Sequence, residues 1–275
     1  MNAEAAAPRP RALSIAGSDS GGGAGIQADL KTFSALGVYG MTAITAVTVQ
    51  NTKGVYGYEA LAPQLVDEQI RAVATDIGVD AAKTGMLANA GIVRAVAAVV
   101  EELEIPNLVV DPVFVSKHGD LLLAEDAVEE LRTRIVPLAT LVTPNLPEAG
   151  GLAGVPVGAK DDMRRAADAI LAAGAHAVLV KGGHLEASTE ASDLFVSGGV
   201  EEWLATERID TPNTHGTGCT LSSAIAAYLA KGWELLESVR AGKEFVTQAI
   251  RHALDIGDGI GSVDQLWSIP PADRG

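Results

Sequence analysis

Glycines and the only cysteine of the chain come together in residues 213–220 (NTHGTGCT), just before a run of small residues typical of a tightly packed helix. Glycine lets the backbone approach a ligand closely, and the start of a helix offers unpaired N–H groups and a positive dipole end. Cys219 is expected in the first turn of that helix, a position that lowers the pKa of a thiol. The segment therefore predicts a phosphate site beside a thiolate that acts as a general base or a nucleophile. The alternative is that Cys219 is a small buried core residue.

A second glycine-rich segment, residues 17–29 (GSDSGGGAGIQAD), joins a predicted strand to a predicted helix. Its spacing does not match G-x-G-x-x-G, and G-x-x-x-x-G-K-[ST] occurs nowhere in the chain. The sequence therefore indicates neither a dinucleotide-binding fold nor a P-loop, and a bound nucleotide would be held without one. The alternative to a ligand-binding loop is a flexible turn between the two elements.

Oxygen ligands and one lysine follow three of the later predicted strands. Asp111 ends an apolar strand, and the spacing of Asn145 and Glu148 lets both face one way at a helix start and hold hydrated Mg²⁺. The same spacing fits a capping box, and the sequence leaves these two interpretations open. Lys181 closes an apolar strand, where a bound anion would offset the cost of its charge. Otherwise its ammonium reaches the surface.

Short β-type runs alternate with longer helical runs, which predicts a mostly parallel sheet covered by helices. In such sheets ligands bind beyond the carboxyl ends of the strands, where polar or glycine residues follow all six predicted strands. The predicted strands are residues 12–16, 42–49, 81–84, 108–111, 141–143 and 177–181, with a late edge hairpin of 193–196 and 202–205. The predicted helices are residues 24–36, 64–77, 90–103, 125–134, 161–173, 217–230 and 235–255.

The composition excludes several classes of protein. The 275 residues are 48% hydrophobic, which excludes a disordered chain, and the net charge of −15 argues against a nucleic-acid binder or docking on an anionic membrane. No signal peptide is recognisable and no apolar run reaches the ~18 residues that cross a bilayer, so a cytoplasmic protein without a membrane partner is expected. We expect a disordered arm over residues 1–10, one domain over 11–267 and a tail over 268–275.

Seven segments in this order resemble the hydroxymethylpyrimidine/phosphomethylpyrimidine kinases of thiamine biosynthesis, which belong to the ribokinase-like superfamily. The first and last segments are long and specific, and the resemblance spans about residues 12–262. It implies a three-layer α/β/α sandwich with a central, mostly parallel sheet. It also implies phosphorylation of 4-amino-5-hydroxymethyl-2-methylpyrimidine and then of its monophosphate, with ATP and Mg²⁺, by a homodimer. The segments are residues 16–40, 45–52, 81–87, 109–113, 143–149, 178–184 and 213–227.

The resemblance also implies a role for individual residues. Gln50 matches the glutamine that pairs with the amino group and ring nitrogen of the pyrimidine, since an amide offers both a donor and an acceptor. Cys219 matches the residue beside the hydroxymethyl group, where many ribokinase-like enzymes have an aspartate base, and Lys181 matches a lysine near the ATP phosphates. The other implied positions are Gly17, Asp19, Ala24, Met86 and Val113 around the pyrimidine, Gly216, Thr217 and Gly218 in the anion hole, Asn145, Thr214 and Lys243 near the nucleotide, and Asp111 and Glu148 at the metal.

Some positions depart from the family pattern. Phe114 stands where methionine is common, and His118 replaces a frequent small residue. Gly150 and Gly151 follow where helix-continuing residues are usual, and each glycine costs up to ~1 kcal/mol in a helix. The histidines form no metal-binding pattern, and His118 and His184 are expected to be structural.

Two alternatives to the pyrimidine kinase stay open at this point. One is a pyridoxal kinase of the same superfamily, against which Gln50 favours the pyrimidine. The other is a pyrimidine-binding sensor that has lost catalysis. The intact glycine turn before Cys219, together with Lys181, argues against the sensor.

Overall fold

The computed structural model describes residues 9–114, 122–123, 125–183 and 190–270. Its strands are β1 (Arg11–Ser18), β2 (Tyr39–Asn51), β3 (Gly54–Ala60), β4 (Ala81–Thr84), β5 (Leu108–Val110), β6 (Leu141–Val142), β7 (Ala177–Val180), β8 (Glu190–Ser197) and β9 (Val200–Glu207). They form one sheet in the order β3-β2-β1-β4-β5-β6-β7-β8-β9. The six strands from β2 to β7 in this order are parallel, whereas β3, β8 and β9 pair antiparallel at the two edges.

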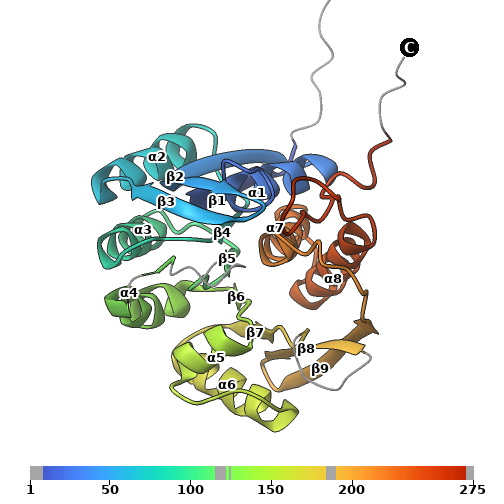
Figure 1. Cartoon of the computed structure of the whole chain (residues 1–275). Helices are drawn as coiled ribbons and strands as arrows, with labels where there is room; N and C mark the ends of the chain where they lie inside the picture. Colours follow the sequence, from blue (N-terminus) through green and yellow to red (C-terminus); the bar gives the residue numbers. More distant parts are fainter. Residues whose placement is uncertain (1–8, 115–121, 124, 184–189, 271–275) are drawn as a thin grey trace, which may run out of the picture.

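Helices cover both faces of the sheet (Figure 1). They are α1 (Gly25–Ala35), α2 (Pro63–Asp76), α3 (Ala90–Glu102), α4 (Glu125–Glu130), α5 (Leu146–Ala153), α6 (Lys160–Ala172), α7 (Thr217–Ala230) and α8 (Leu235–Arg251). α4 continues as a π-helical turn (Leu131–Ile135) and a 3₁₀ turn (Val136–Leu138). The helices from α2 to α6 lie on one face, and α1, α7 and α8 lie on the other. The predicted three-layer arrangement is therefore confirmed.

The core explains why the central strands are recognisable in the sequence. Successive residues of a strand point to opposite faces of the sheet. In β5, Leu108 and Val110 join the core under α2 to α6, whereas Val109 joins the core under α1, α7 and α8. Because both faces are covered, such strands are continuous apolar runs.

The antiparallel edges were only partly predicted. The late hairpin is confirmed as β8 and β9, joined by Gly198 and Gly199, whose positive φ angles suit a tight hairpin turn. β3 was missed because it is largely exposed and has no apolar run. The prediction that Gln50 follows the second strand is wrong, because β2 extends to Asn51 and turns into β3.

The helix predictions hold with small shifts at the ends. The last helix stops at Arg251 instead of residue 255. The predicted helix start at Asn145 is confirmed as the N-terminus of α5, for which no range was predicted, since Gly150 and Gly151 lie in its middle. Among the described residues, no helix combines the length and apolar character that a bilayer span requires. His118 and His184 lie outside the described residues, as do parts of the predicted arm and tail (1–8 and 271–275).

Candidate active site

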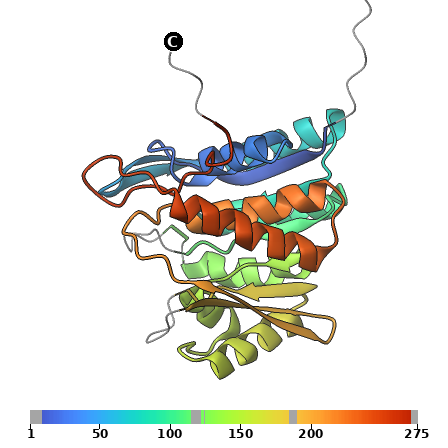
Figure 2. The same ribbon diagram turned by 90° about the vertical axis from the view of Figure 1, so that its right-hand side faces the viewer.

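The β2–β3 hairpin and the segment that leads into α7 lie at the same end of the sheet (Figure 2). α7 begins after Gly216, whose φ of 85° is a left-handed conformation that favours glycine. No side chain caps the first turn of α7, and residues 216–219 are partly exposed. The turn is therefore open to a ligand, although its role as an anion hole stays a prediction.

Lys181 lies against this turn with two buried carboxylates. Its Nζ is 2.9 Å from Oδ1 of Asp111 and 3.9 Å from Oε2 of Glu148. A Cβ built on Gly218 would be 3.4 Å from both Lys181 Nζ and Asp111 Oδ2. The structure thus brings the predicted glycine turn, the lysine and both predicted metal ligands together, although they come from four separate segments.

Glu148 and Asn145 form the capping box that the sequence offered as one of two interpretations. Asn145 Oδ1 accepts from the backbone N–H of Glu148, and Glu148 Oε2 accepts from that of Asn145, over 2.9 and 2.8 Å. Burial raises the pKa of Glu148 to about 7, while Lys181 lowers it and Asp111 raises it. Glu148 therefore caps α5 and also adds a carboxylate to the cluster around Lys181.

The donor set can be tested against Mg²⁺. Among the described residues, no three His, Cys, Asp or Glu side chains converge into a metal site. However, Mg²⁺ is usually held by one or two carboxylates, with phosphates and waters as further ligands. Asp111 and Glu148 supply two such carboxylates, and the raised pKa of Glu148 reflects a burial cost that a cation would offset. The residues therefore fit Mg²⁺ accompanied by a phosphate ligand.

Cys219 does not have the electrostatics predicted from its place in a helix. Burial raises the pKa of its thiol to about 11, although Lys83 lowers it. The backbone N–H of Gly25, at the start of α1, also donates to the sulfur. The expected lowering of the pKa by the helix terminus is thus wrong, because desolvation outweighs it. In the free protein the thiol keeps its proton.

Sequence reasoning missed the ion pair that accompanies Cys219. Lys83 Nζ lies 3.0 Å from both carboxylate oxygens of Asp29, and neither side chain is exposed. Ser14 and Ser223 donate their hydroxyls to the same carboxylate over 2.5 and 2.6 Å. The sequence signal that could have revealed this ion pair is the lysine within the short strand β4. A lysine buried there requires a partner of opposite charge.

The glycine-rich segment after β1 is built around Asp19. Its carboxylate accepts backbone N–H groups from Gly21, Gly23 and Ala24 at 2.7 to 3.1 Å. It is also 2.9 Å from Nε2 of His215. The segment is therefore an ordered turn held by a central carboxylate, and not the flexible connection offered as the alternative.

Several predicted ring-lining positions are also close together. A Cβ on Gly17 would be 3.1 Å from Sδ of Met86, so these two residues are in contact. Thr45 fixes the backbone of Met86 by donating to its carbonyl over 2.6 Å. Val113 is partly buried two residues after Asp111. Their contact with a substrate stays a prediction.

Lys243 and Thr214 are less clearly placed for a nucleotide. Lys243 on α8 donates to Oδ2 of Asp193 over 2.7 Å, and Oδ1 of Asp193 accepts from the backbone N–H of Gly182 over 2.9 Å. Lys243 thus supports the residue that follows Lys181. The carbonyl of Thr214 accepts from the hydroxyl of Thr217. Nucleotide contacts of Lys243 and Thr214 stay predictions.

Two departures from the family pattern are connected in space. A Cβ on Gly151 would be only 2.5 Å from Cε2 of Phe114. The large ring at residue 114 therefore requires the missing side chain at residue 151. Glycine in α5 has a packing reason that the sequence alone did not reveal.

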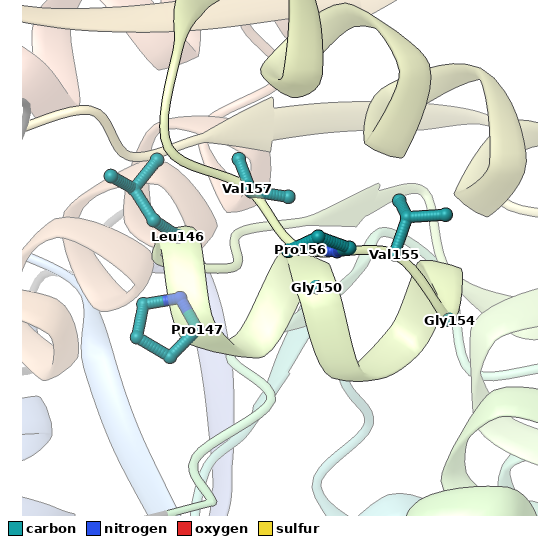
Figure 3. Close-up of a pocket in the computed structure, with 7 residues that line it drawn as sticks. All are labelled: Leu146, Pro147, Gly150, Gly154, Val155, Pro156 and Val157. Carbon is teal, nitrogen blue, oxygen red and sulfur yellow. The ribbon is translucent and has the colours of Figure 1, made fainter.

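A surface groove of about 420 Å³ lies along α5 (Figure 3). Val157 and Leu146 are among the residues that line it. None of the predicted site residues does so. The groove is therefore lined by chain neighbours of Asn145 and Glu148, and not by these two residues themselves.

The sequence model of a family described as phosphomethylpyrimidine kinase matches residues 19–264. The hydroxymethylpyrimidine/phosphomethylpyrimidine kinase of Streptomyces coelicolor is 54% identical over 260 residues, which cover 94% of this chain and 96% of the relative. The thiamine biosynthesis bifunctional protein ThiED of Geobacter sulfurreducens is 48% identical over 266 residues, which cover 97% of this chain and 54% of the relative.

Solved structures also resemble the chain over most of its length. The pyridoxal kinase of Bacillus subtilis in an ADP complex has a TM-score of 0.88 and 41% identity, and the match covers 94% of this chain and 98% of that one. The phosphomethylpyrimidine kinase of Clostridium difficile 630 has a TM-score of 0.79 and 45% identity, and the match covers 88% of this chain and 100% of that one. Both share the ribokinase-like fold with this chain.

Proposed function

Because the chain belongs to the phosphomethylpyrimidine kinase family, we propose that it transfers a phosphoryl group from ATP to 4-amino-5-hydroxymethyl-2-methylpyrimidine. The acceptor is the oxygen of the hydroxymethyl group. The same site then phosphorylates the monophosphate to the diphosphate. These steps belong to thiamine biosynthesis, the pathway that appears in the name of the Geobacter relative.

One observation carries the proposal on the structural side. The open turn at the start of α7 lies beside Lys181, since a Cβ on Gly218 would be only 3.4 Å from the lysine Nζ. Phosphoryl transfer needs positioning and charge neutralisation more than covalent chemistry. Backbone N–H groups, a lysine and two carboxylates for a metal supply both at one place.

Each group has a proposed task. The first turn of α7, residues 216–218, receives the transferred phosphoryl group, and Lys181 neutralises its charge. Bound at Asp111 and Glu148, Mg²⁺ would supply charge neutralisation for the phosphates. Thr214, Asn145 and Lys243 are proposed near the nucleotide.

Cys219 is the proposed base for the hydroxymethyl group. Since its thiol is protonated in the free protein, this role requires the thiol to lose its proton when the substrates bind. Lys83 is the cation that lowers the pKa of Cys219 and would stabilise the thiolate. The pyrimidine would be held by Gln50, with the remaining ring contacts made by residues of the Asp19 turn, Gly17, Ala24, Met86 and Val113.

The test is an assay of ADP release with hydroxymethylpyrimidine, its monophosphate and pyridoxal side by side. We expect turnover of both pyrimidines that depends on ATP and Mg²⁺, with a lower kcat/KM for pyridoxal. Pyridoxal is included because the Bacillus subtilis pyridoxal kinase has a TM-score of 0.88 to this chain. Preferred turnover of pyridoxal, or ring binding without ADP release, would contradict the proposal.

The assembly and location of the enzyme are also proposed. We propose one kinase domain over residues 11–267, which is supported by the family match over 19–264. We further propose a homodimer formed through the β2–β3 hairpin, on which Val49 and Tyr56 are 63% and 66% exposed. Light scattering at micromolar concentration measures this directly. We also propose a cytoplasmic location, since a chain with a single cysteine is built without the disulfides that are common in secreted proteins.

A further inference from the structure

A buried histidine connects the two glycine-rich segments of the site. The backbone N–H of His215 donates to Gly261, and its carbonyl accepts from Val263, both over 3.1 Å. Its ring packs on Gly23, where a Cβ would be only 2.5 Å from Cδ2 of the ring. The imidazole is therefore held in one place by backbone bonds on one side and by the Asp19 turn on the other.

The proton of this imidazole can be assigned from its partner. Asp19 accepts three backbone N–H groups, as an ionised carboxylate does, and its Oδ2 is 2.9 Å from His215 Nε2. Burial alone would raise the pKa of Asp19, but the hydrogen bonds from His215 and Ala24 lower it below its usual range. Because a carboxylate only accepts, Nε2 of His215 carries hydrogen and donates to it.

This assignment constrains the amide of Gln50. The atom of Gln50 placed as Nε2 is 3.3 Å from Nε2 of His215. Two N–H donors cannot bond to each other, whereas an amide oxygen at that position accepts the same hydrogen. The oxygen and nitrogen of a glutamine amide are assigned from such networks, and a half-turn exchanges them with no change in shape.

A second neighbour gives the same answer independently. The hydroxyl of Thr48 donates to the carbonyl of Ser18 over 3.0 Å, which uses its only hydrogen. The other amide atom of Gln50, placed as Oε1, is 3.3 Å from the same hydroxyl oxygen, and an oxygen there would compete with Ser18 for that hydrogen. The single hydrogen serves one acceptor, and the bond to the Ser18 carbonyl is the shorter of the two. With that bond made, Thr48 accepts from Gln50, and the atom facing it is the NH₂ group.

We propose that His215 and Thr48 lock the Gln50 amide with its oxygen toward His215 and its NH₂ toward Thr48. This inference rests on the proposed function, because it concerns how the enzyme orients its pyrimidine. The remaining lone pair of the Gln50 amide oxygen and the remaining N–H of its NH₂ group then face the ligand, with the acceptor on the His215 side and the donor on the Thr48 side. A ring amino group lies on the His215 side, and the neighbouring ring nitrogen lies on the Thr48 side. His215 and Thr48 are positioning residues, since they act through Gln50.

The matched variants are Thr48→Val and Thr48→Ser. Valine has the shape of threonine but cannot accept from Gln50, whereas serine keeps the acceptor. The probes are hydroxymethylpyrimidine and the analogue that lacks the amino group, 5-hydroxymethyl-2-methylpyrimidine. Calorimetry without ATP measures the ratio of their Kd values, and the ADP assay measures kcat and KM separately.

We expect Thr48→Val to reduce the preference for the amino-bearing ring by about tenfold, through Kd and KM, with kcat changed less than twofold. Thr48→Ser keeps the preference. In a Gln50→Leu background, Thr48→Val has no further effect on the ratio, because the amide it orients is gone. His215→Phe, which removes the donor, is expected to reduce the ratio in the same way.

An unchanged ratio in a folded Thr48→Val variant would overturn the proposed orientation. The same holds if its effect persists in the Gln50→Leu background, because that result indicates a merely structural role. The proposed function fails in a different way, by absence of pyrimidine turnover in the unmodified enzyme. If His215→Phe does not fold, the Thr48 series decides alone.

Discussion

The buried ion pair of Lys83 and Asp29 allows a quantitative test of how the site is held together. Both side chains are completely buried, and each carboxylate oxygen of Asp29 is 3.0 Å from the ammonium. Replacing Lys83 by methionine keeps most of the side-chain volume and removes the charge. Asp29 is then a buried carboxylate without a counter-ion.

Removing one partner of a buried pair typically costs about 3–5 kcal/mol. Here two serine hydroxyls still donate to Asp29, so we expect Lys83→Met to reduce the free energy of unfolding by about 3 kcal/mol. Urea denaturation at pH 7 measures this loss. The control is Lys53→Met, which breaks the ion pair of Lys53 with Asp258. These two side chains are 53% and 83% exposed, so we expect the substitution to cost about 1 kcal/mol or less.

A double variant separates charge from packing. Asn at residue 29 has nearly the shape of Asp. Its amide oxygen can accept from one of the two serines, and its NH₂ group can donate to the hydroxyl of the other. Lys83→Met combined with Asp29→Asn is therefore expected to be more stable than Lys83→Met alone, because no charge is left unpaired. A loss below about 1 kcal/mol for Lys83→Met, or a double variant no better than that single variant, would refute this reasoning.

Three further outcomes are expected. Cys219→Ala lowers kcat more than it raises KM in steady-state kinetics if the thiolate acts during transfer, and an unchanged kcat removes the base role. The pKa of about 7 for Glu148 lies above its unfolded value, so the protein should lose stability as pH rises from about 4.5 to 7. Urea titrations of Glu148→Gln should lack this loss. Equal pH profiles of stability for the variant and the unmodified protein would contradict this expectation. Gly151→Ala destabilises by about 1 kcal/mol in thermal melts because its methyl group meets Phe114, whereas in a Phe114→Leu background it should stabilise; stabilisation in both backgrounds argues against the contact.

Local patterns in the chain were enough for most of the architecture. α7 was predicted with its observed bounds because a run of small helix-forming residues is a local property, and β7 was predicted to within one residue because an uninterrupted apolar run is another. Edge strand β3 escaped prediction because its stability comes from pairing with β2 and not from burial of its own side chains. The start of α5 was predicted but its extent was not, because Gly151 is explained only by a ring from another segment.

Some features of the site were likewise predictable from the sequence, whereas others required the tertiary structure. Residue types and spacing within single segments determined the glycine turn, Cys219 and the cluster of Lys181 with its carboxylates, since strand ends of a parallel sheet meet at one edge. Only the tertiary structure decided the protonation of Cys219, because desolvation depends on what surrounds the sulfur and here outweighs the helix terminus. It also decided the partners of Lys83 and His215, which are 54 and 196 residues away along the chain. Ion pairing and hydrogen bonding depend on distance in space, and that distance is a product of the fold.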